Sequence, residues 1–389
     1  MTNIILVADC EIRPSSYDPL HLAWELRNHA VFARVVALGY AGAEDKAVFG
    51  QASREELESA AYWKNSGADL VIAYYWWASE RMLDAIREAN LPLVFFMDST
   101  GVFDPMITFP MAVRAYATAL NAVQNRVRMI KAATHSLLHR KEIMAAQLRK
   151  MEKADLLVIE TELFRKRLAS FFRSQGRPDL ADRIRVVSHS AKKPFTSILP
   201  GSQRKEQVVG ACHWLEAGKN ARGWFAAIKK ALAAQPNMEA TAFGAKGNLW
   251  IEENVKGASR LALTPWIPAT ELAGAFSEAR ILFSASWSES LPIVALEALC
   301  SGCTIVAPPI DGFRSLGLEE GFGTLARSHS TRHLCEALQT EWREWEAGHR
   351  DPVRIANEWR QRVGLQTVAE KWAVICGEIL AGQTHALKI

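Results

Sequence analysis

Short apolar segments alternate with segments of helical composition along the whole chain, and this alternation limits the possible folds more than any other feature. The strand candidates in the first half are Ile4 to Ala8, Phe32 to Leu38, Leu70 to Tyr74, Leu93 to Met97, Leu156 to Ile159 and Ile184 to Val187. Those in the second half are Val208 to Cys212, Ala240 to Phe243, Leu261 to Leu263, Ile281 to Ser284 and Thr304 to Ala307. Strands separated by helices form parallel sheets, because each helix returns the chain to the same edge. The pattern therefore predicts an α/β protein.

The length of the chain indicates more than one domain. Its 389 residues suit two domains of roughly 190 residues each. The stretch from Pro194 to Glu206 contains two prolines, a glycine and several polar residues, which is typical of a linker. We therefore predict two doubly wound, Rossmann-like domains, residues 1–198 and 199–366. Because ligands bind at the carboxyl ends of parallel strands, we expect the two domains to face one another across a cleft.

The composition is that of a protein dissolved in water. Apolar residues make up 49% and charged residues 23% of the chain, and no apolar run approaches the roughly 20 residues of a membrane span. The apolar opening from Asn3 to Ala8 is followed at once by Asp9 and Glu11, too early for a signal peptide. We therefore expect a cytoplasmic protein. The cysteines have no framework spacing, and the pair Cys300 and Cys303 has no second ligand pair, which favours buried thiols over a metal or redox site.

The segment from Ile281 to Gly312 contains the strongest signal for a ligand site. An apolar strand ends in a serine-rich turn, and Pro292 suits the first turn of a helix. Ser290 is a good N-cap residue, so we predict a helix that starts near Leu291. The first N–H groups of a helix are unpaired and partly positive, so a diphosphate could bind there.

Two glutamates lie on either side of this predicted helix start. Glu289 is in the loop, and Glu297 is on the helix, with a side chain that tilts back toward the helix N-terminus. One carboxylate could contact a sugar and the other a ribose. Two glutamates at this spacing also occur by chance, and a glutamate in the first turns of a helix is often only a partner of the helix dipole.

The residues around the glutamates make the signal specific. The pattern comprises Ser286-x-x-Glu289, Pro292, Leu296-Glu297-Ala298, Gly302, Val306 and Gly312. It resembles the donor-site signature of retaining GT-B glycosyltransferases, especially family 4 (glycosyl transferases group 1). Residues Ile184 to Phe195 are similar to the interdomain segment of the same family. The resemblance implies two Rossmann-like domains, with a C-terminal helix in about residues 367–389 that packs back on the first domain.

The resemblance also implies further donor-binding residues, including Ser290 and Leu291 at the helix start. The family usually has an Arg directly after the first strand of the second domain and a Lys before the next helix. The Arg is absent here, and either Lys219 or Arg222 takes the role of the Lys.

A glycine turn and an aromatic residue extend the same comparison. Gly244 occupies the place of the family's glycine turn beside the nucleotide. Trp266 either stacks on the base or is a core or rim aromatic residue.

The acceptor side departs from the family pattern. The segment from Leu93 to Gly101 resembles a strand and loop that carries a histidine in many relatives, and Met97 stands in its place. Asp98 is then the candidate for contact with the acceptor hydroxyl, and a structural turn is its alternative role. Trp76 and Trp77 follow another strand and could stack on a sugar or lipid, or pack in the core.

Residues 112–153 have helical composition and are strongly basic. Nine Lys and Arg residues stand against Glu142 and Glu152, a net charge of +7. This stretch is either a solvated surface or a contact with an anionic membrane or acceptor, where each cation contributes about 1 kcal/mol. Nucleic-acid binding is a poorer fit, because no recognised binding motif accompanies the charge.

Together these features predict a retaining glycosyltransferase. It would move a sugar from a nucleotide diphosphate sugar to an acceptor hydroxyl of a glycan or glycolipid. The sequence has no Asp-x-Asp metal motif, so we expect no metal and no cofactor other than the donor co-substrate. The alternative is a GT-B-like carbohydrate- or nucleotide-binding protein that has lost turnover, as the missing Arg and the Met97 replacement would allow.

Overall fold

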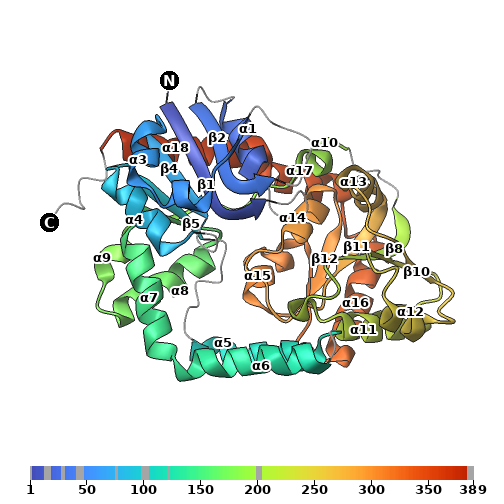
Figure 1. Cartoon of the computed structure of the whole chain (residues 1–389). Coiled ribbons are helices and arrows are strands. Elements are labelled where there is room, and N and C mark those ends of the chain that lie inside the picture. The colour runs from blue at the N-terminus through green and yellow to red at the C-terminus, as the bar shows by residue number, and fades with distance from the viewer. Residues whose placement is uncertain are drawn as a thin grey trace. The chain divides into compact units, whose positions relative to one another are not determined.

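The computed structural model describes residues 2–12, 19–27, 31–40, 48–74, 78–97, 105–120, 123–198 and 204–382. The chain forms two compact units (Figure 1). The first unit contains Met1–Phe103, Lys141–His189 and Leu365–Ile389, and the second contains Asp104–Arg140 and Ser190–Gly364. None of the described helices combines the length and the apolar character that a membrane crossing needs.

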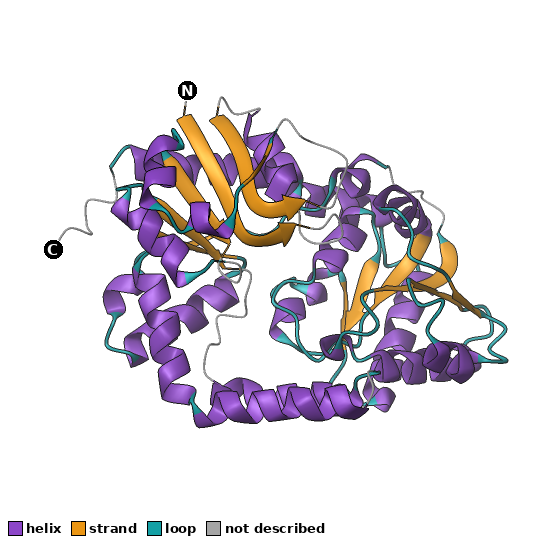
Figure 2. Ribbon diagram, viewed as in Figure 1, coloured by secondary structure: helices purple, strands orange, loops and turns teal. Residues whose placement is uncertain are grey.

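The first unit is built on a seven-stranded sheet in the order β3-β2-β1-β4-β5-β6-β7, with every neighbouring pair parallel (Figure 2). Its strands are β1 (Thr2–Ile12), β2 (Val31–Tyr40), β3 (Phe49–Gln51), β4 (Leu70–Tyr74), β5 (Leu93–Met97), β6 (Leu156–Ile159) and β7 (Ile184–Val186). Its helices are α1 (Pro19–Arg27), α2 (Arg54–Leu57), α3 (Ala60–Asn65), α4 (Glu80–Glu88), α7 (Arg140–Glu152), α8 (Glu162–Ser174), α9 (Pro178–Ala181) and α18 (Leu365–Leu380).

Both faces of this sheet are covered, which explains why its strands are apolar throughout. Alternate residues of β1 enter different cores: Ile5 and Val7 pack on one face, and Ile4 and Leu6 on the other. The C-terminal helix α18 closes the second face, where the Trp372 ring meets Phe96 edge-on at 5.4 Å. The last helix is therefore part of the core of the first unit.

The second unit has a six-stranded parallel sheet in the order β10-β9-β8-β11-β12-β13. The strands are β8 (Lys205–Ala211), β9 (Glu239–Phe243), β10 (Leu261–Leu263), β11 (Ala279–Phe283), β12 (Thr304–Ala307) and β13 (Gly323–Leu325). The longer helices are α5 (Pro105–Thr118), α6 (Val123–Leu138), α11 (Ala221–Ala234), α13 (Ala269–Glu278), α14 (Ile293–Cys300), α16 (Thr331–Glu346) and α17 (Pro352–Val363). Shorter ones are α10 (Lys193–Ser197), α12 (Leu249–Val255), α15 (Asp311–Arg314) and the 3₁₀ turns η2 (Ala217–Lys219) and η3 (Leu318–Glu320).

The units differ from the predicted domain ranges in two places. Helices α5 and α6 were assigned to the first domain, but Ala115 of α5 and Ala119, directly after this helix, pack against Ala217 of the second unit. The division near residue 190 precedes the predicted boundary at 198, because α10 buries Phe195 in the second core. Proline and glycine mark the turns of this segment, but they do not reveal on which unit it packs.

The edge strands β3 and β13 were not among the predicted strands. Each has three residues and lies at the border of its sheet, where a long apolar run is not required. The other strands coincide with predicted segments to within a few residues.

A buried ion pair in the second unit gives a test of its packing. Glu341 on α16 is fully buried, and Arg350 donates to both of its oxygens, at 2.7 and 2.8 Å. Arg350→Ala would leave this carboxylate without its cation. We expect the free energy of unfolding to fall by about 3 to 5 kcal/mol in urea titrations.

The exposed pair of Arg332 with Glu336 on the same helix is the matched control. Arg332→Ala should change the free energy of unfolding by less than about 1 kcal/mol, because surface ion pairs contribute little. An equal loss for the two variants would contradict the importance of burial.

Candidate functional site

The second sheet has a topological switch between β8 and β11. The chain runs from β8 outward to β9 and β10, and then returns to the other side of β8 as β11. Loops that leave the carboxyl ends of these two neighbours go in opposite directions, and such a switch opens a crevice in which ligands bind. Lys219 follows β8 and Glu289 follows β11. Their side chains meet at this point, with Nζ 2.8 Å from Oε1 and 3.1 Å from Oε2.

The two charges are held in place by their surroundings. Ser286 donates a hydrogen bond to Glu289 Oε1 at 2.7 Å. Burial alone would lower the pKa of Lys219, but the adjacent Glu289 carboxylate outweighs burial and raises that pKa above its usual range. A Cβ atom at Gly312 would lie 2.6 Å from the Glu289 carbonyl oxygen, so only glycine fits behind this loop. The site therefore presents a permanent cation beside a fixed carboxylate.

The helix after Glu289 begins later than we predicted. Helix α14 starts at Ile293 with Pro292 as its N-cap residue, and Ser290 is not its cap. Pro292 has extended backbone angles (φ −74°, ψ 96°), which keep the preceding residues out of the helix. Leu291 is 6% exposed, so it anchors the loop. The first N–H groups of α14, at Ile293 and Val294, have no acceptor in the preceding turn of helix.

Glu297 lies one turn into α14 and is 6% exposed. Burial raises its pKa to about 7, although Lys192 opposes this shift from 4.0 Å. Within the described part of the chain, its Oε1 atom has no hydrogen-bond partner. A buried acceptor without a donor is unfavourable by about 1 to 3 kcal/mol, so this atom fits a ligand hydroxyl group. Lys192 was not a predicted site residue. It is the N-cap residue of α10 and approaches Glu297 only in the folded chain, so no local sequence pattern links the two residues.

The structure separates the two candidate cations. Arg222 Nε donates to the Thr118 carbonyl oxygen at 3.1 Å, and its guanidinium lies 4.5 Å from the Trp250 ring. It joins helices within the second unit, whereas Lys219 contacts Glu289. Asn220, which we had not predicted, links the two loops: it accepts from Gly223 N and donates to the Ala285 carbonyl oxygen at 3.0 Å. An Asn before an apolar helical segment was a signal for this cap.

Helix α5 also contacts the loop that carries Glu289. Trp287 Nε1 donates to Thr118 Oγ1 at 3.0 Å, although the two residues are 169 positions apart. The Trp287 amide donates to the Gly218 carbonyl oxygen at 2.7 Å, and its ring stacks on His329 at 4.5 Å. No sequence pattern connects these residues, so the contribution of α5 was missed.

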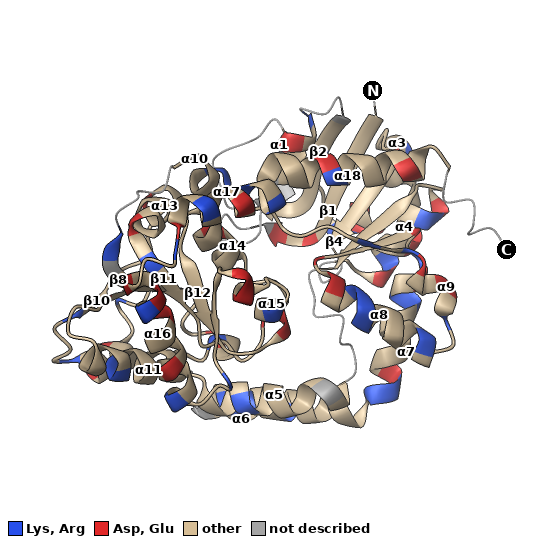
Figure 3. Ribbon diagram, turned by 180° about the vertical axis from the view of Figure 1, so that it is seen from behind, with Lys and Arg blue, Asp and Glu red and all other residues tan. Residues whose placement is uncertain are grey.

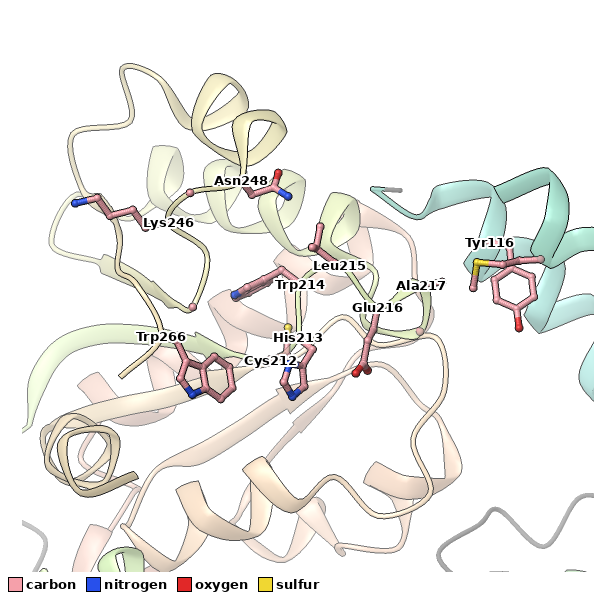
Figure 4. A pocket seen from close by; sticks show the side chains of 14 residues that line it. Tyr116, Cys212, His213, Trp214, Leu215, Glu216, Ala217, Lys246, Asn248 and Trp266 are labelled. Carbon is pink, nitrogen blue, oxygen red and sulfur yellow. The ribbon is translucent and has the colours of Figure 1, made fainter. Parts of the chain in front are cut away.

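A cavity of about 760 Å³ lies beside this site, between the loops after β8, β9 and β10 and the helices α5 and α6 (Figure 4). Gly244 lines it with a positive φ of 76°, and a Cβ atom there would lie 2.7 Å from the Trp266 ring. Trp266 is 57% exposed and stacks on His213. Trp266 is therefore a rim aromatic residue and not a core residue.

The predicted acceptor-side residues Asp98, Trp76 and Trp77 lie outside the described residues. Met97 is fully buried at the end of β5. His189 and Glu160 of the first unit form a buried pair, with Nε2 2.6 Å from Oε1.

The two cysteines of the Cys300-x-x-Cys303 motif are both fully buried. Burial raises the pKa of Cys300 to about 12 and that of Cys303 to about 11. Both thiols are therefore protonated and pack in the core.

Comparison with known proteins agrees with this geometry. Residues 207–342 match the family Glycosyl transferases group 1. Within the chain, 134 residues are 28% identical to D-inositol 3-phosphate glycosyltransferase from Nocardia farcinica, which is 33% of this chain and 27% of that protein. The chain thus spans about a quarter of the length of this curated relative.

Solved structures resemble the whole chain. Anabaena HepE in complex with UDP-glucose has a TM-score of 0.66 at 13% identity, over 97% of this chain and 100% of that one. Sucrose-phosphate synthase from Thermosynechococcus elongatus has a TM-score of 0.63 at 14% identity, over 98% and 100%. The resemblance seen in the sequence is confirmed: residues 207–342 match group 1 glycosyl transferases, and the chain has the GT-B fold, with two Rossmann-like units.

Proposed function

We propose that this protein is a retaining glycosyltransferase that moves a sugar from a nucleotide diphosphate sugar to an acceptor hydroxyl, without a metal ion. The observation that carries the proposal is the contact of Lys219 with Glu289 at the switch between β8 and β11, directly before the N-terminus of α14. A cation and free N–H groups at one point suit a diphosphate, and a carboxylate beside them suits sugar hydroxyls.

The proposed reaction needs stabilisation of the leaving group. The bond between the anomeric carbon and the diphosphate oxygen breaks, and the nucleoside diphosphate leaves with the electron pair. The acceptor oxygen bonds to the same face of that carbon, and its proton passes to the departing phosphate. Lys219 and the N-terminus of α14 would stabilise the growing negative charge, which is the largest contribution in many enzymes. Glu289 would hold the donor sugar.

The nucleoside has a separate contact in this scheme. Glu297 would accept hydrogen bonds from ribose hydroxyls through its Oε1 atom, which has no hydrogen-bond donor in the described part of the chain. Donors based on UDP are the first to test, since Anabaena HepE binds UDP-glucose. We further propose a glycan or glycolipid acceptor, with Asp98, Trp76 and Trp77 on the acceptor side.

We also propose a peripheral contact with the inner face of an anionic membrane. The surface that makes this contact is smaller than the whole basic stretch 112–153. Directly after α7, Lys153 pairs with Asp84, and Arg149 of α7 lies near Glu80. Figure 3 shows Lys and Arg residues on both α6 and α7. Helix α6 instead exposes the basic residue Lys131 between apolar residues. Its Val127 is 46% and Leu138 77% exposed, and spacings of four and seven residues place all three on one helix face.

The catalytic part of the proposal is tested by Glu289→Gln. With UDP-glucose and other nucleotide sugars and a pool of acceptors, we expect nucleotide release by the natural chain. The variant should lose roughly a hundredfold in kcat, because a neutral amide holds the sugar less well in the transition state. The exposed Glu253 of α12 provides the control Glu253→Gln, which should keep full activity. Nucleotide binding without release for every donor would instead support a binding protein that has lost turnover.

Glu297→Gln should have opposite effects on stability and on binding. The raised pKa of Glu297 means that the folded chain keeps this proton up to about pH 7, while the unfolded chain loses it near pH 4.5. The carboxyl group therefore stabilises the fold below pH 4.5, and this contribution disappears as the pH rises to 7. At pH 8 the Gln variant should be more stable, by up to about 3 kcal/mol, and at pH 5 the difference should nearly vanish.

Thermal unfolding at both pH values measures this difference, and titration with UDP measures binding. We expect UDP to bind the variant at least tenfold more weakly at pH 8, because the ionised carboxylate is lost as an acceptor. Equal stability of the two proteins at pH 8 would mean that Glu297 is already paired.

The membrane contact is tested by Leu138→Glu in sedimentation with vesicles. The natural chain should sediment with vesicles that contain phosphatidylglycerol and stay in solution with phosphatidylcholine alone. The variant should lose most of this binding, because a charge replaces Leu138, an apolar side chain of α6 that is 77% exposed. The reversed-charge change Lys153→Glu, directly after α7, should not weaken vesicle binding beyond its effect on folding. Equal losses for the two variants would contradict a surface limited to α6.

A further inference from the structure

The peptide group that joins Ser286 to Trp287 is held at both of its ends. Its carbonyl oxygen accepts a hydrogen bond from His329 Nε2 at 3.2 Å. Its amide, at Trp287, donates to the Gly218 carbonyl oxygen at 2.7 Å. Because Gly218 directly precedes Lys219, this peptide group ties the loop after β11 to the turn that carries the cation of the site.

The side chain of Trp287 adds two contacts to those of its backbone. Its ring stacks on His329, with centroids 4.5 Å apart and planes within 22° of parallel. Its Nε1 atom donates to Thr118 Oγ1 at 3.0 Å. The Thr118 hydroxyl donates its own proton to the Arg114 carbonyl oxygen at 2.9 Å, within α5, and accepts the indole proton on a lone pair. The indole is therefore fixed by one stacked ring and one hydrogen bond.

The carboxylate of Glu289 depends on the same short stretch of chain. Ser286, one residue before Trp287, donates to Glu289 Oε1 at 2.7 Å. Asn220 anchors the loop before Ser286 through the Ala285 carbonyl oxygen, and the contacts of Trp287 anchor it after Ser286. A shift of Trp287 would therefore displace the hydroxyl group that orients the Glu289 carboxylate.

Thr118 of α5 connects the same two loops a second time. Its carbonyl oxygen accepts from Arg222 Nε at 3.1 Å, and Arg222 lies in the first turn of α11, shortly after Lys219. Its hydroxyl group accepts from Trp287 in the loop after β11. All of these residues belong to the second unit. The C-terminal end of α5 thus contacts both loops that diverge at the switch between β8 and β11.

We propose that Trp287 is a positioning residue, which orients the Lys219 and Glu289 pair through its contacts with α5, with the Lys219 turn and with His329. A reacting group must be held to within about 0.5 Å of its productive place, and a misplacement of about 1 Å can cost about a hundredfold in rate. The effect on turnover rests on the proposed glycosyl transfer, whereas the effect on the ion pair does not, so the two are tested separately.

Trp287→Phe in the full chain tests the effect on turnover. Phenylalanine keeps a ring against His329 and removes the Nε1–H donor, and Thr118→Val removes the acceptor. With a donor that the natural chain turns over, each variant should lower kcat by about tenfold and change the donor KM by less than about twofold. Such a split is expected because ground-state binding is kept while positioning in the transition state is lost.

The double variant shows whether one hydrogen bond carries the effect. Trp287→Phe and Thr118→Val remove the same contact, so together they should lower kcat about as much as either does alone. Losses that multiply in the double variant, or a change confined to KM, would overturn the proposal.

Trp345 on α16 provides a matched control within the same unit. Its Nε1 atom donates to Thr304 Oγ1 at 2.9 Å, so Trp345→Phe removes the same kind of hydrogen bond. Thr304 is the first residue of β12, at the edge of the sheet opposite the carboxyl-terminal loops. Trp345→Phe should lower the temperature of unfolding and keep the kcat of the folded chain. Equal losses of kcat in Trp345→Phe and Trp287→Phe would mean that Trp287 only stabilises the fold.

The titration of Lys219 tests the positioning without any donor. Its side-chain signal is followed by NMR in a chain labelled with ¹³C-lysine and is assigned by its absence from Lys219→Arg. Burial lowers the pKa of Lys219, and the Glu289 carboxylate outweighs burial and raises that pKa. A loosened contact should therefore make Lys219 titrate at a lower pH in Trp287→Phe than in the natural chain, and at an unchanged pH in Trp345→Phe.

The two readouts separate the positioning role from the transferase. The same Lys219 titration in the natural chain and in Trp287→Phe would overturn the positioning role, whatever the activity. A natural chain that releases no nucleotide from any donor would refute the transferase, and a lowered Lys219 titration in Trp287→Phe would then still support the positioning role.

Discussion

The parallel pairing of β8 with β11 is the constraint on which the rest of the second unit depends. These two strands are neighbours in the sheet, but the chain between them makes an excursion through β9 and β10, so their carboxyl-terminal loops diverge. Lys219 and Glu289 lie at the start of this divergence, and each charge needs the other because both are largely buried. The close approach of Gly312 to the Glu289 backbone completes this arrangement from α15, the short helix that follows β12.

Stability and binding have opposite requirements at this site. Glu297 is buried with only a distant cation, and its unpaired oxygen disfavours the ionised form in the empty protein. Such an unfavourable group is expected where a ligand supplies the missing donor. The Glu341 and Arg350 pair shows the contrast, since both carboxylate oxygens there are bonded within the protein. Glu341 therefore stabilises one part of the unit, whereas Glu297 leaves an acceptor oxygen that a ligand could bind.

Helices α5 and α6 show how a segment from the first half of the chain completes a site in the second. Thr118 holds both Arg222 and Trp287, and Tyr116 forms a wall of the large cavity. The loop that carries Glu289 is thus fixed by a helix that precedes it by more than a hundred residues.

The sequence by itself determined the two parallel sheets and placed the loops that carry Lys219 and Glu289 at one edge of the second sheet, because buried strands need continuous apolar runs and their carboxyl ends share one edge. It also placed Glu289 in a loop and Glu297 on a helix. It predicted the start of α14 too early, because residue types alone do not show the extended backbone angles of Pro292. Only the tertiary structure showed that Lys219, and not Arg222, contacts Glu289, brought Lys192 within 4.0 Å of Glu297, and attached α5 and α6 to the second unit. These facts depend on contacts between residues far apart along the chain, and local propensity and spacing carry no information about which distant surfaces pack together.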